Sequence, residues 1–362
     1  MKTDDFNFDL PETSIAQYPP ERRGDSRLLV LDRADCVESA ESAIGRPGKA
    51  HLTHTMVKDL LLYLEPGTLM VFNDSKVRKA RIYGTAIETG AVVEFLLLEP
   101  LAGQTGPYAI SATWRAMASK ARKQKIGRTY LFPDGVKGTI VGEENDEKII
   151  EFDVALGDRY LDLNGHMPLP PYIKRGDEAT DSERYQTVYA KTTGSAACPT
   201  AGLHFTQPLL DSIAAAGIDI EWVTLHVGLG TFLPVRVDEV ERHRMHEEWY
   251  AVSEKTAAAV NAAKKEGRKV IAVGTTSLRT LESAWNPDAG LWAGSSSTSI
   301  FIYPGYRFNV VDQLITNFHT PKSTLLMLVA AFAGRETILD AYAEAIREGY
   351  RFFSYGDAML IR

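Results

Sequence analysis

Apolar runs and helix-like segments alternate through the last part of the chain. Thr206 stands where it can cap a helix that ends near Gly217, and the largely apolar run 218–227 is typical of a strand. A helix, a strand and a helix are then predicted over 254–266, 269–273 and 278–284. This alternation predicts an α/β fold with a mainly parallel sheet and flanking helices.

Two further buried strands are predicted near the N-terminus. The runs 27–31 and 69–72 are rich in Leu and Val, and a helix is expected between them over 56–64. These elements fit the same sheet as the strands predicted after residue 206. A long segment with a different hydrophobic pattern lies between the two groups in the sequence.

That stretch, from about residue 76 to 158, consists of short alternating segments divided by Gly, Pro, Asp and Asn turns. The segments cover 91–98, 108–117, 129–132, 138–141 and 148–154. They predict a small antiparallel β-barrel inserted into the α/β fold. We therefore expect a discontinuous α/β domain over 1–75 and 158–362, interrupted by a barrel domain over 76–157.

Composition narrows the function classes. The chain has 362 residues, 44% of them hydrophobic and 24% charged, and its formal net charge is −7. This is ordinary for a globular protein, and a nucleic-acid partner would need a local basic patch. The N-terminus lacks the apolar region of a signal peptide, and the apolar run near 325–332 is too short to span a bilayer. We expect a cytoplasmic protein without membrane contact.

Metal binding is not expected. Cys36 and Cys198 lack CxxC spacing, and the pair His243 and His246 has no third ligand fixed by the spacing.

A strand-to-helix turn is the first candidate binding site. It contains Gly274, Thr275, Thr276 and Ser277, with Arg279 one turn into the helix. Backbone N–H groups and the positive helix end meet at such a turn, which can hold a carboxylate or phosphate. A simple helix start with a surface arginine is an equally good interpretation of this feature alone. The turn matches neither a dinucleotide fingerprint nor a P-loop.

Three histidines stand next to glycines or at expected strand ends: His204, His226 and His319. Ligands bind beyond the carboxyl ends of strands in open α/β sheets, so the three imidazoles would form one site if they converge there. Imidazole is well suited to proton transfer near neutral pH. Each histidine taken alone is more often structural.

Aromatic and basic residues supply further candidates. Phe205, Phe232 and Tyr303 lie beside the polar motifs and could stack on a base or face a cation, although most such rings belong to a core. The barrel segment carries two basic clusters, and we take Arg81, Arg122, Lys123 and Lys125 from them as candidate nucleic-acid contacts. A solvated basic loop is the alternative.

Matching segments from one end of the chain to the other resemble a known family. They are Asp5–Pro11, Ile15–Pro19, Val71–Asp74, Met167–Ile173, Arg184–Tyr189, Pro199–Phe205, Leu225–Phe232, Gly274–Glu282, Tyr303–Tyr306, Thr316–Leu328 and Tyr350–Ile361. In this order they resemble the S-adenosylmethionine:tRNA ribosyltransferase-isomerase family of queuosine biosynthesis. The family is similar in having an α/β domain interrupted by a small barrel.

The resemblance implies the reaction. The ribosyl group of S-adenosylmethionine is transferred and isomerised onto 7-aminomethyl-7-deazaguanine at the tRNA wobble position, giving epoxyqueuosine-tRNA, adenine and methionine. S-adenosylmethionine is then a consumed co-substrate, and neither a cofactor nor a metal is implied.

This chemistry assigns roles to the candidates as hypotheses. A base must remove a proton from the carbon beside the sulfonium, and His204, His226 and His319 are the candidates. Asp74 or Glu282 would orient an imidazole or a ribose hydroxyl, and the turn at Gly274 with Arg279 would hold the methionyl carboxylate. Two other classes remain open at this point: a non-enzymatic RNA-binding adaptor, and a sugar-phosphate or nucleotide enzyme that uses the same turn for phosphate.

Overall fold

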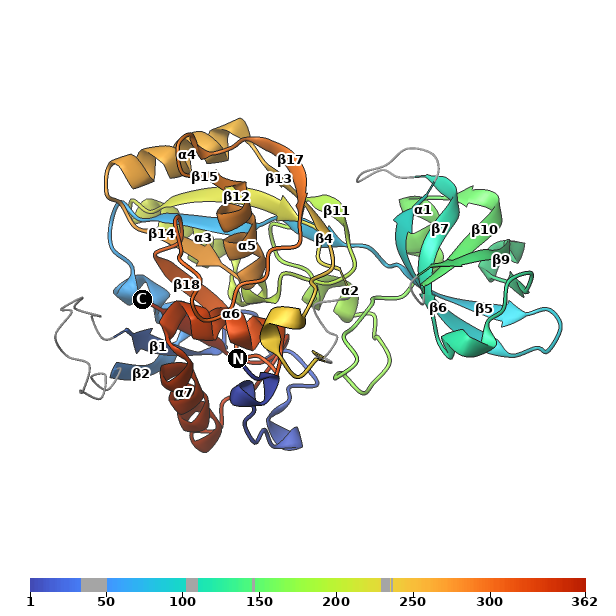
Figure 1. Cartoon of the computed structure of the whole chain (residues 1–362), viewed down its shortest axis with the longest axis horizontal. Coiled ribbons are helices and arrows are strands. Elements are labelled where there is room, and N and C mark those ends of the chain that lie inside the picture. The colour runs from blue at the N-terminus through green and yellow to red at the C-terminus, as the bar shows by residue number, and fades with distance from the viewer. Residues whose placement is uncertain (34–50, 102–109, 145–146, 229–234, 236) are drawn as a thin grey trace.

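A large sheet with helices and a separate barrel make up the molecule (Figure 1). The computed structural model describes residues 1–33, 51–101, 110–144, 147–228, 235 and 237–362. Within these ranges the sheet has nine strands in the order β17-β13-β12-β3-β14-β18-β19-β1-β2. Their bounds are β1 Arg27–Asp32, β2 His51–Met56, β3 Leu69–Asn73, β12 Asp219–Leu225, β13 Glu248–Val252, β14 Val270–Val273, β17 Gly294–Thr298, β18 Gln313–Asn317 and β19 Ala358–Ile361.

The sheet is mixed, so the predicted mainly parallel sheet is not confirmed. The central strands β12, β3, β14 and β18 are parallel neighbours, and β19 pairs in parallel with β1. The other four neighbouring pairs are antiparallel, and they include both edges of the sheet. The sequence predicts β1, β3, β12 and β14 but not the other five strands of this sheet. One of these five, β17, is a serine-rich segment with no apolar pattern.

Helices pack on both faces of this sheet because buried side chains alternate along its strands. Leu69 and Val71 of β3 face a core shared with α4, α5, α6 and α7. Met70 and Phe72 face a second core shared with α3 and a 3₁₀ helix over Val57–Tyr63, which stands where a helix was predicted over 56–64. The helices are α1 Asp158–Asn164, α2 Asp181–Arg184, α3 Gln207–Ala215, α4 Glu254–Lys265, α5 Thr275–Ala284, α6 Thr324–Ala333 and α7 Arg335–Arg347.

The predicted N-cap of α3 is confirmed. The Thr206 hydroxyl accepts a hydrogen bond from the Leu209 N–H at 3.3 Å, as an N-cap should. None of the helices in the described ranges is both long and apolar enough to cross a bilayer.

The predicted antiparallel barrel is confirmed. Its strands are β5 Arg81–Ala86, β6 Val92–Pro100, β7 Ser111–Ala118, β8 Thr129–Leu131, β9 Lys137–Glu144 and β10 Glu147–Leu156. They close in the order β10-β7-β6-β5-β8-β9 around buried Phe95, Trp114 and Tyr130. Gly138 leaves room for this core, since a Cβ there would lie 2.8 Å from the Phe132 ring.

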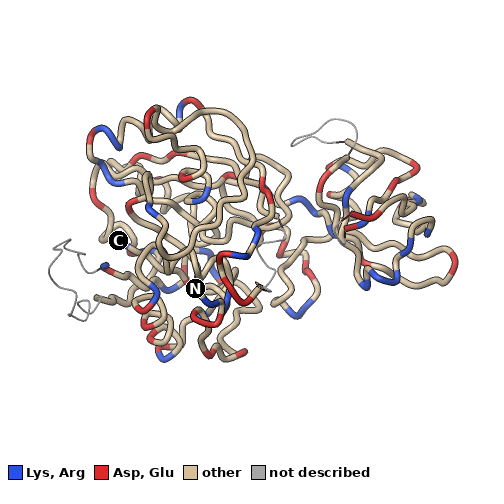
Figure 2. The backbone as a smooth tube through the Cα atoms, in the orientation of Figure 1, with Lys and Arg blue, Asp and Glu red and all other residues tan. Residues whose placement is uncertain are grey.

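The barrel stands beside the α/β body (Figure 1). Two short parallel strands, β4 Ser75–Val77 and β11 Thr192–Ser195, lie in the body near the connection to the barrel. A further small hairpin joins β15 Trp285–Asn286 and β16 Gly290–Leu291. Figure 2 shows acidic and basic residues interspersed over both parts of the molecule.

Candidate active site

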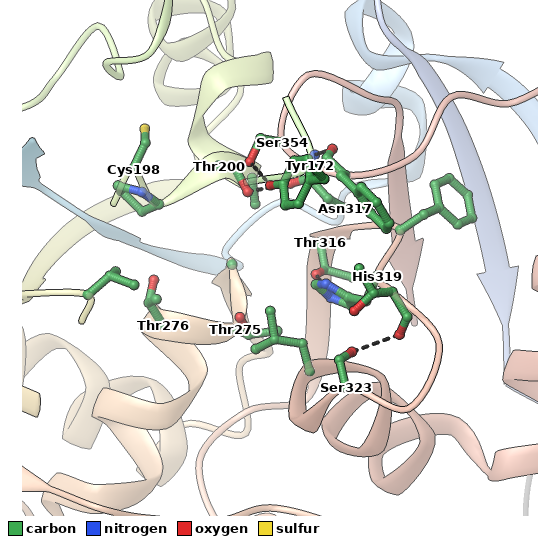
Figure 3. A pocket seen from close by; sticks show the side chains of 18 of the residues that line it. Tyr172, Cys198, Thr200, Thr275, Thr276, Thr316, Asn317, His319, Ser323 and Ser354 are labelled. Atoms are coloured by element: carbon green, nitrogen blue, oxygen red, sulfur yellow. Dashed lines mark hydrogen bonds between the residues drawn. The ribbon is translucent and has the colours of Figure 1, made fainter. Parts of the chain in front are cut away.

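A cavity of about 240 Å³ opens at the carboxyl ends of β14 and β18. Figure 3 shows side chains converging on it from the turn after β14, the segment after β18 and the loops at Tyr172, Thr200 and Ser354. Cavities at this edge of an α/β sheet commonly bind ligands, because polar loops meet there above a rigid core. We call this space the strand-end cavity.

The start of α5 forms one wall of the strand-end cavity. Gly274 has φ +91°, a backbone conformation that favours glycine, and no side chain caps the helix. The backbone N–H groups of Thr275, Thr276 and Ser277 have no acceptor among the described residues. This wall therefore offers N–H donors and a positive helix end to an anionic ligand group.

Asn73 holds this helix start against the sheet. Its side-chain amide donates to the Leu225 carbonyl oxygen at 3.0 Å and to the Thr276 hydroxyl at 3.2 Å. The amide oxygen accepts from the N–H groups of Ser75 and Leu225. One fully buried residue thus fixes the ends of β3 and β12 and the first turn of α5 together.

His319 lines the cavity opposite the helix start (Figure 3). Its Nε2 lies 2.9 Å from the Thr316 hydroxyl, and its backbone N–H donates to the Tyr342 hydroxyl. Burial lowers the pKa of His319 to about 3, because desolvation disfavours the imidazolium. The imidazole is therefore neutral near pH 7.

The wall next to His319 contains a strained residue. Phe353 has φ +73°, which is uncommon for a side chain of this size. Its carbonyl oxygen accepts a hydrogen bond from the Asn317 amide at 3.0 Å, and its ring lies 4.6 Å from the Tyr172 ring, centroid to centroid. Backbone strain of this kind persists where the surroundings hold it in place and is frequent at functional sites.

His204 does not line this cavity. Its Nδ1 lies 2.9 Å from the Ser26 hydroxyl, and the Asn317 amide donates to its Nε2 at 3.1 Å. Burial lowers the pKa of His204 to about 4. With both ring nitrogens engaged, this histidine supports Asn317 from behind the cavity wall.

His226 faces a different space, a cleft between the barrel and the α/β body. Its ring stacks on Trp249 with centroids 5.0 Å apart. Burial, followed by the nearby Arg78 charge, lowers the pKa of His226 to about 4. The three histidines thus lie at one end of the sheet, but the predicted convergence of three imidazoles in one cavity is not observed.

Three charged candidates also lie outside the strand-end cavity. Arg279 is buried and forms an ion pair with Glu248 of β13. Glu282 accepts hydrogen bonds from the loop over 306–311, including the N–H groups of Val310 and Val311. Asp74 accepts from the Thr224 hydroxyl at 2.6 Å, and burial raises its pKa. In this structure all three hold protein groups together.

The described aromatic candidates also lie outside the strand-end cavity. Phe205 is fully buried against Phe72, and Tyr303 packs beside Phe301 outside the cavity. Phe232 lies outside the described residues. The aromatic residues that line the cavity are Tyr172, Phe318 and Phe353, although the Phe318 ring packs into the core against Tyr342 and Phe352. Their segments belong to the matched motifs, but nothing in the local pattern distinguishes a lining ring from a core ring.

The barrel candidates differ in exposure. Arg122, Lys123 and Lys125 are exposed around a short 3₁₀ turn after β7. No carboxylate among the described residues lies within ion-pair distance of these three. Arg81 is largely buried, donates to the Leu169 carbonyl oxygen and pairs with Glu94. The exposed turn, and not Arg81, is therefore available for an anionic partner.

The buried histidines predict that acid destabilises the fold. The pKa values of His204, His226 and His319 are lowered in the folded state, so the unfolded chain binds more protons between about pH 4 and 6.5. Stability contributed by these groups is present above pH 6.5 and falls as the pH decreases through this window, by up to about 1.4 kcal/mol per pH unit for each histidine.

Urea unfolding at pH 7.5 and pH 5 measures this change. His204→Asn is expected to reduce the pH dependence relative to that of the wild type. An equal pH dependence in wild type and His204→Asn contradicts the assignment.

Groups of three or more His, Cys, Asp or Glu that could hold a metal ion are absent from the described ranges. The strand-end cavity has a helix start for an anionic group and a neutral imidazole opposite it. This combination of an α/β fold and a polar cavity at the strand ends is typical of enzymes that bind a small ligand with an anionic group.

The comparisons give the family. A family model described as "Queuosine biosynthesis protein" matches residues 3–361. Curated proteins named S-adenosylmethionine:tRNA ribosyltransferase-isomerase match over 100% of this chain: those of Treponema denticola and Clostridioides difficile are 53% and 48% identical and are covered over 100% of their own length. The chain belongs to this queuosine biosynthesis family, and it is accordingly a transferase-isomerase.

A solved structure agrees with this placement. The crystal structure of S-adenosylmethionine tRNA ribosyltransferase from Thermotoga maritima has 33% sequence identity and a TM-score of 0.53. The match covers 99% of this chain and 100% of that one. Family membership decides against the non-enzymatic RNA-binding adaptor.

Proposed function

We propose that this chain transfers and isomerises the ribosyl moiety of S-adenosylmethionine onto 7-aminomethyl-7-deazaguanine at the tRNA wobble position. Epoxyqueuosine-tRNA forms, and adenine and methionine leave. The observation that carries the proposal is the full-length similarity to curated S-adenosylmethionine:tRNA ribosyltransferase-isomerases, which reaches 53% identity with the Treponema denticola protein. The reaction needs no cofactor or metal, because S-adenosylmethionine itself is consumed, and it takes place in the cytoplasm.

The strand-end cavity supports a site for S-adenosylmethionine. The methionyl carboxylate of S-adenosylmethionine fits the N–H groups at Thr275, Thr276 and Ser277, because a helix start favours negative charge. Tyr172 and Phe353 offer aromatic faces to the sulfonium or the adenine ring. These rings replace Phe205 and Tyr303 in our proposal, because the latter two do not reach the cavity.

His319 is our choice for the catalytic base. The carbon beside a sulfonium loses a proton more readily than an ordinary carbon, since the adjacent positive charge stabilises the resulting carbanion. A neutral imidazole in the same cavity can accept that proton without first releasing one of its own. The electron pair stays on carbon as an ylide, and ribosyl transfer to the RNA amine follows with loss of adenine and methionine.

The domains divide the work in this proposal. The α/β catalytic domain, residues 1–75 and 158–362, holds S-adenosylmethionine, and the inserted barrel domain, residues 76–157, contacts tRNA.

A product assay tests the reaction. The protein is incubated with S-adenosylmethionine and tRNA that carries the aminomethyl-deazaguanine, and adenine and methionine are followed by chromatography. We expect one adenine and one methionine for each tRNA modified, and none with a control tRNA that has guanine at this position. Activity on nucleotides or sugar phosphates without RNA would support the rival enzyme class instead.

The exposed basic turn predicts a salt-dependent interaction with tRNA. Replacing Arg122, Lys123 and Lys125 by alanine is expected to weaken tRNA binding and to flatten its dependence on salt, by about 0.7–0.9 in the logarithmic slope for each phosphate that is no longer neutralised. Binding is measured from about 50 to 300 mM KCl, the range over which such slopes are resolved. Lys137→Ala on β9 is the control, and an unchanged slope in the triple variant contradicts the placement.

A further inference from the structure

The cleft between the barrel and the α/β body is larger than the strand-end cavity. Its volume is about 660 Å³, and we call it the interdomain cleft. Leu98, Pro100 and Met117 form its barrel side, and His226 and Trp249 form its body side. No function considered above uses this space.

An aromatic shelf is built into the body side. His226 and Trp249 stack with an interplanar angle of 21°, and Trp249 stays 40% exposed although it belongs to a strand within the sheet. Gly194 makes room for the histidine, since a Cβ there would lie 2.6 Å from Nε2. A flat aromatic face opposite the apolar residues of the barrel fits a planar ring, and bases stack on such faces.

The rim of the cleft carries more carboxylates than guanidinium groups. Its carboxylates are Glu99, Glu147, Glu247 and Glu248, and its guanidinium groups are Arg78 and Arg115. Arg115 already pairs with Glu99 and Glu147, and Glu248 already pairs with Arg279 of α5. An acidic excess disfavours an RNA phosphate here and favours a ligand with N–H donors or positive charge.

Arg78 adds one specific donor. Its side chain is 5% exposed, and its Nε donates to Asp158 at 2.7 Å. Its Nη2 is buried without a hydrogen-bond partner in the described structure. A buried guanidinium N–H left in this state is satisfied when a ligand oxygen, such as a ring carbonyl, reaches it.

We propose that the interdomain cleft binds the wobble base of the tRNA after it leaves the anticodon stack. This inference rests on the proposed function, which supplies the base. 7-Aminomethyl-7-deazaguanine has a flat ring for the Trp249 shelf, a carbonyl for Arg78 and an ammonium with N–H donors for the carboxylates. Enzymes that act on a base commonly extrude it into a pocket.

The position of the cleft suits such a role. Val227 lines both the interdomain cleft and the strand-end cavity, and among the described residues it is the only one that does. A base in the cleft therefore lies next to the strand-end cavity, and its aminomethyl group meets the ribosyl donor where the two spaces adjoin at Val227.

Kinetics with a matched pair of variants test the proposal. Trp249→Ala is expected to raise the KM for tRNA by about tenfold to a hundredfold, the usual effect of losing one base stack, while S-adenosylmethionine binding by calorimetry stays within about twofold. Trp292→Ala removes a tryptophan that is 52% exposed and lies outside both spaces, and it is expected to change neither value. An unchanged KM for tRNA in Trp249→Ala, or an equal loss of S-adenosylmethionine binding, overturns the assignment.

Fluorescence separates this proposal from the proposed function. Free 7-aminomethyl-7-deazaguanine is expected to quench tryptophan emission saturably in wild type and Trp292→Phe but not in Trp249→Phe, and guanine is expected to bind more weakly. Equal quenching in both variants, or no saturation in wild type, counts against the cleft whatever the product assay shows. Saturable quenching together with no adenine release leaves the base site standing and refutes the reaction.

Discussion

Replacing His319 by glutamine is expected to slow adenine release by about 10²–10⁴-fold, the usual contribution of a positioned acid or base. Glutamine can keep a hydrogen bond to the Thr316 hydroxyl, but it cannot accept a proton from carbon. Binding of S-adenosylmethionine, measured by calorimetry, should change little. His51→Gln is the control, because the His51 side chain is 76% exposed and does not line the cavity.

The pH profile gives an independent check of this role. Burial lowers the pKa of His319 to about 3, so the basic form is already fully populated at pH 5. We therefore expect that protonation of His319 causes no fall in turnover near pH 6.5. The shape of the pH profile in that region should be the same in wild type and in His319→Gln. A folded His319→Gln variant with turnover close to that of wild type would show that another group takes the proton.

Replacing Arg279 by methionine is expected to lower the free energy of unfolding by about 3–5 kcal/mol, because the Glu248 carboxylate then stays buried without the guanidinium charge opposite it. The two side chains are only 4% and 5% exposed, so water compensates little. Urea unfolding measures the loss. The double variant Arg279→Met with Glu248→Leu should recover part of it, but not all, because Glu248 also accepts the Gly228 N–H.

Arg242→Met is the matched control for this prediction. Arg242 and Glu239 form an exposed pair, with side chains 73% and 54% accessible, and such pairs contribute about 0–1 kcal/mol. The result also decides between two roles for Arg279. A raised KM for S-adenosylmethionine without loss of stability would favour the carboxylate contact inferred from sequence over the structural ion pair.

The sequence predicted the two-part architecture correctly, but it did not predict the directions in which the strands pair. The barrel was predictable because its turns punctuate alternating segments, and α3 was predictable because Thr206 caps it. The antiparallel edge pairs were not, since pairing direction depends on long-range contacts such as Glu248 with Thr298. A serine-rich strand carries no hydrophobic pattern from which to predict it.

The candidate site was predictable only in part, for a related reason. The turn at Gly274 and the position of His319 follow from strand ends, and both line the cavity. Arg279 and Glu282 lie on the same helix, but their partners come from β13 and from the loop over 306–311. Motifs show which residues accompany the chemistry, whereas burial and partners decide whether a side chain meets a ligand or another part of the protein.

Val227 lies where the strand-end cavity and the interdomain cleft adjoin. Its backbone is fixed by Ser195, whose hydroxyl accepts the Val227 N–H. Under the proposed function the two substrates must meet beside this residue, so the size of one isopropyl group sets how closely the amine and the ribosyl carbon can approach.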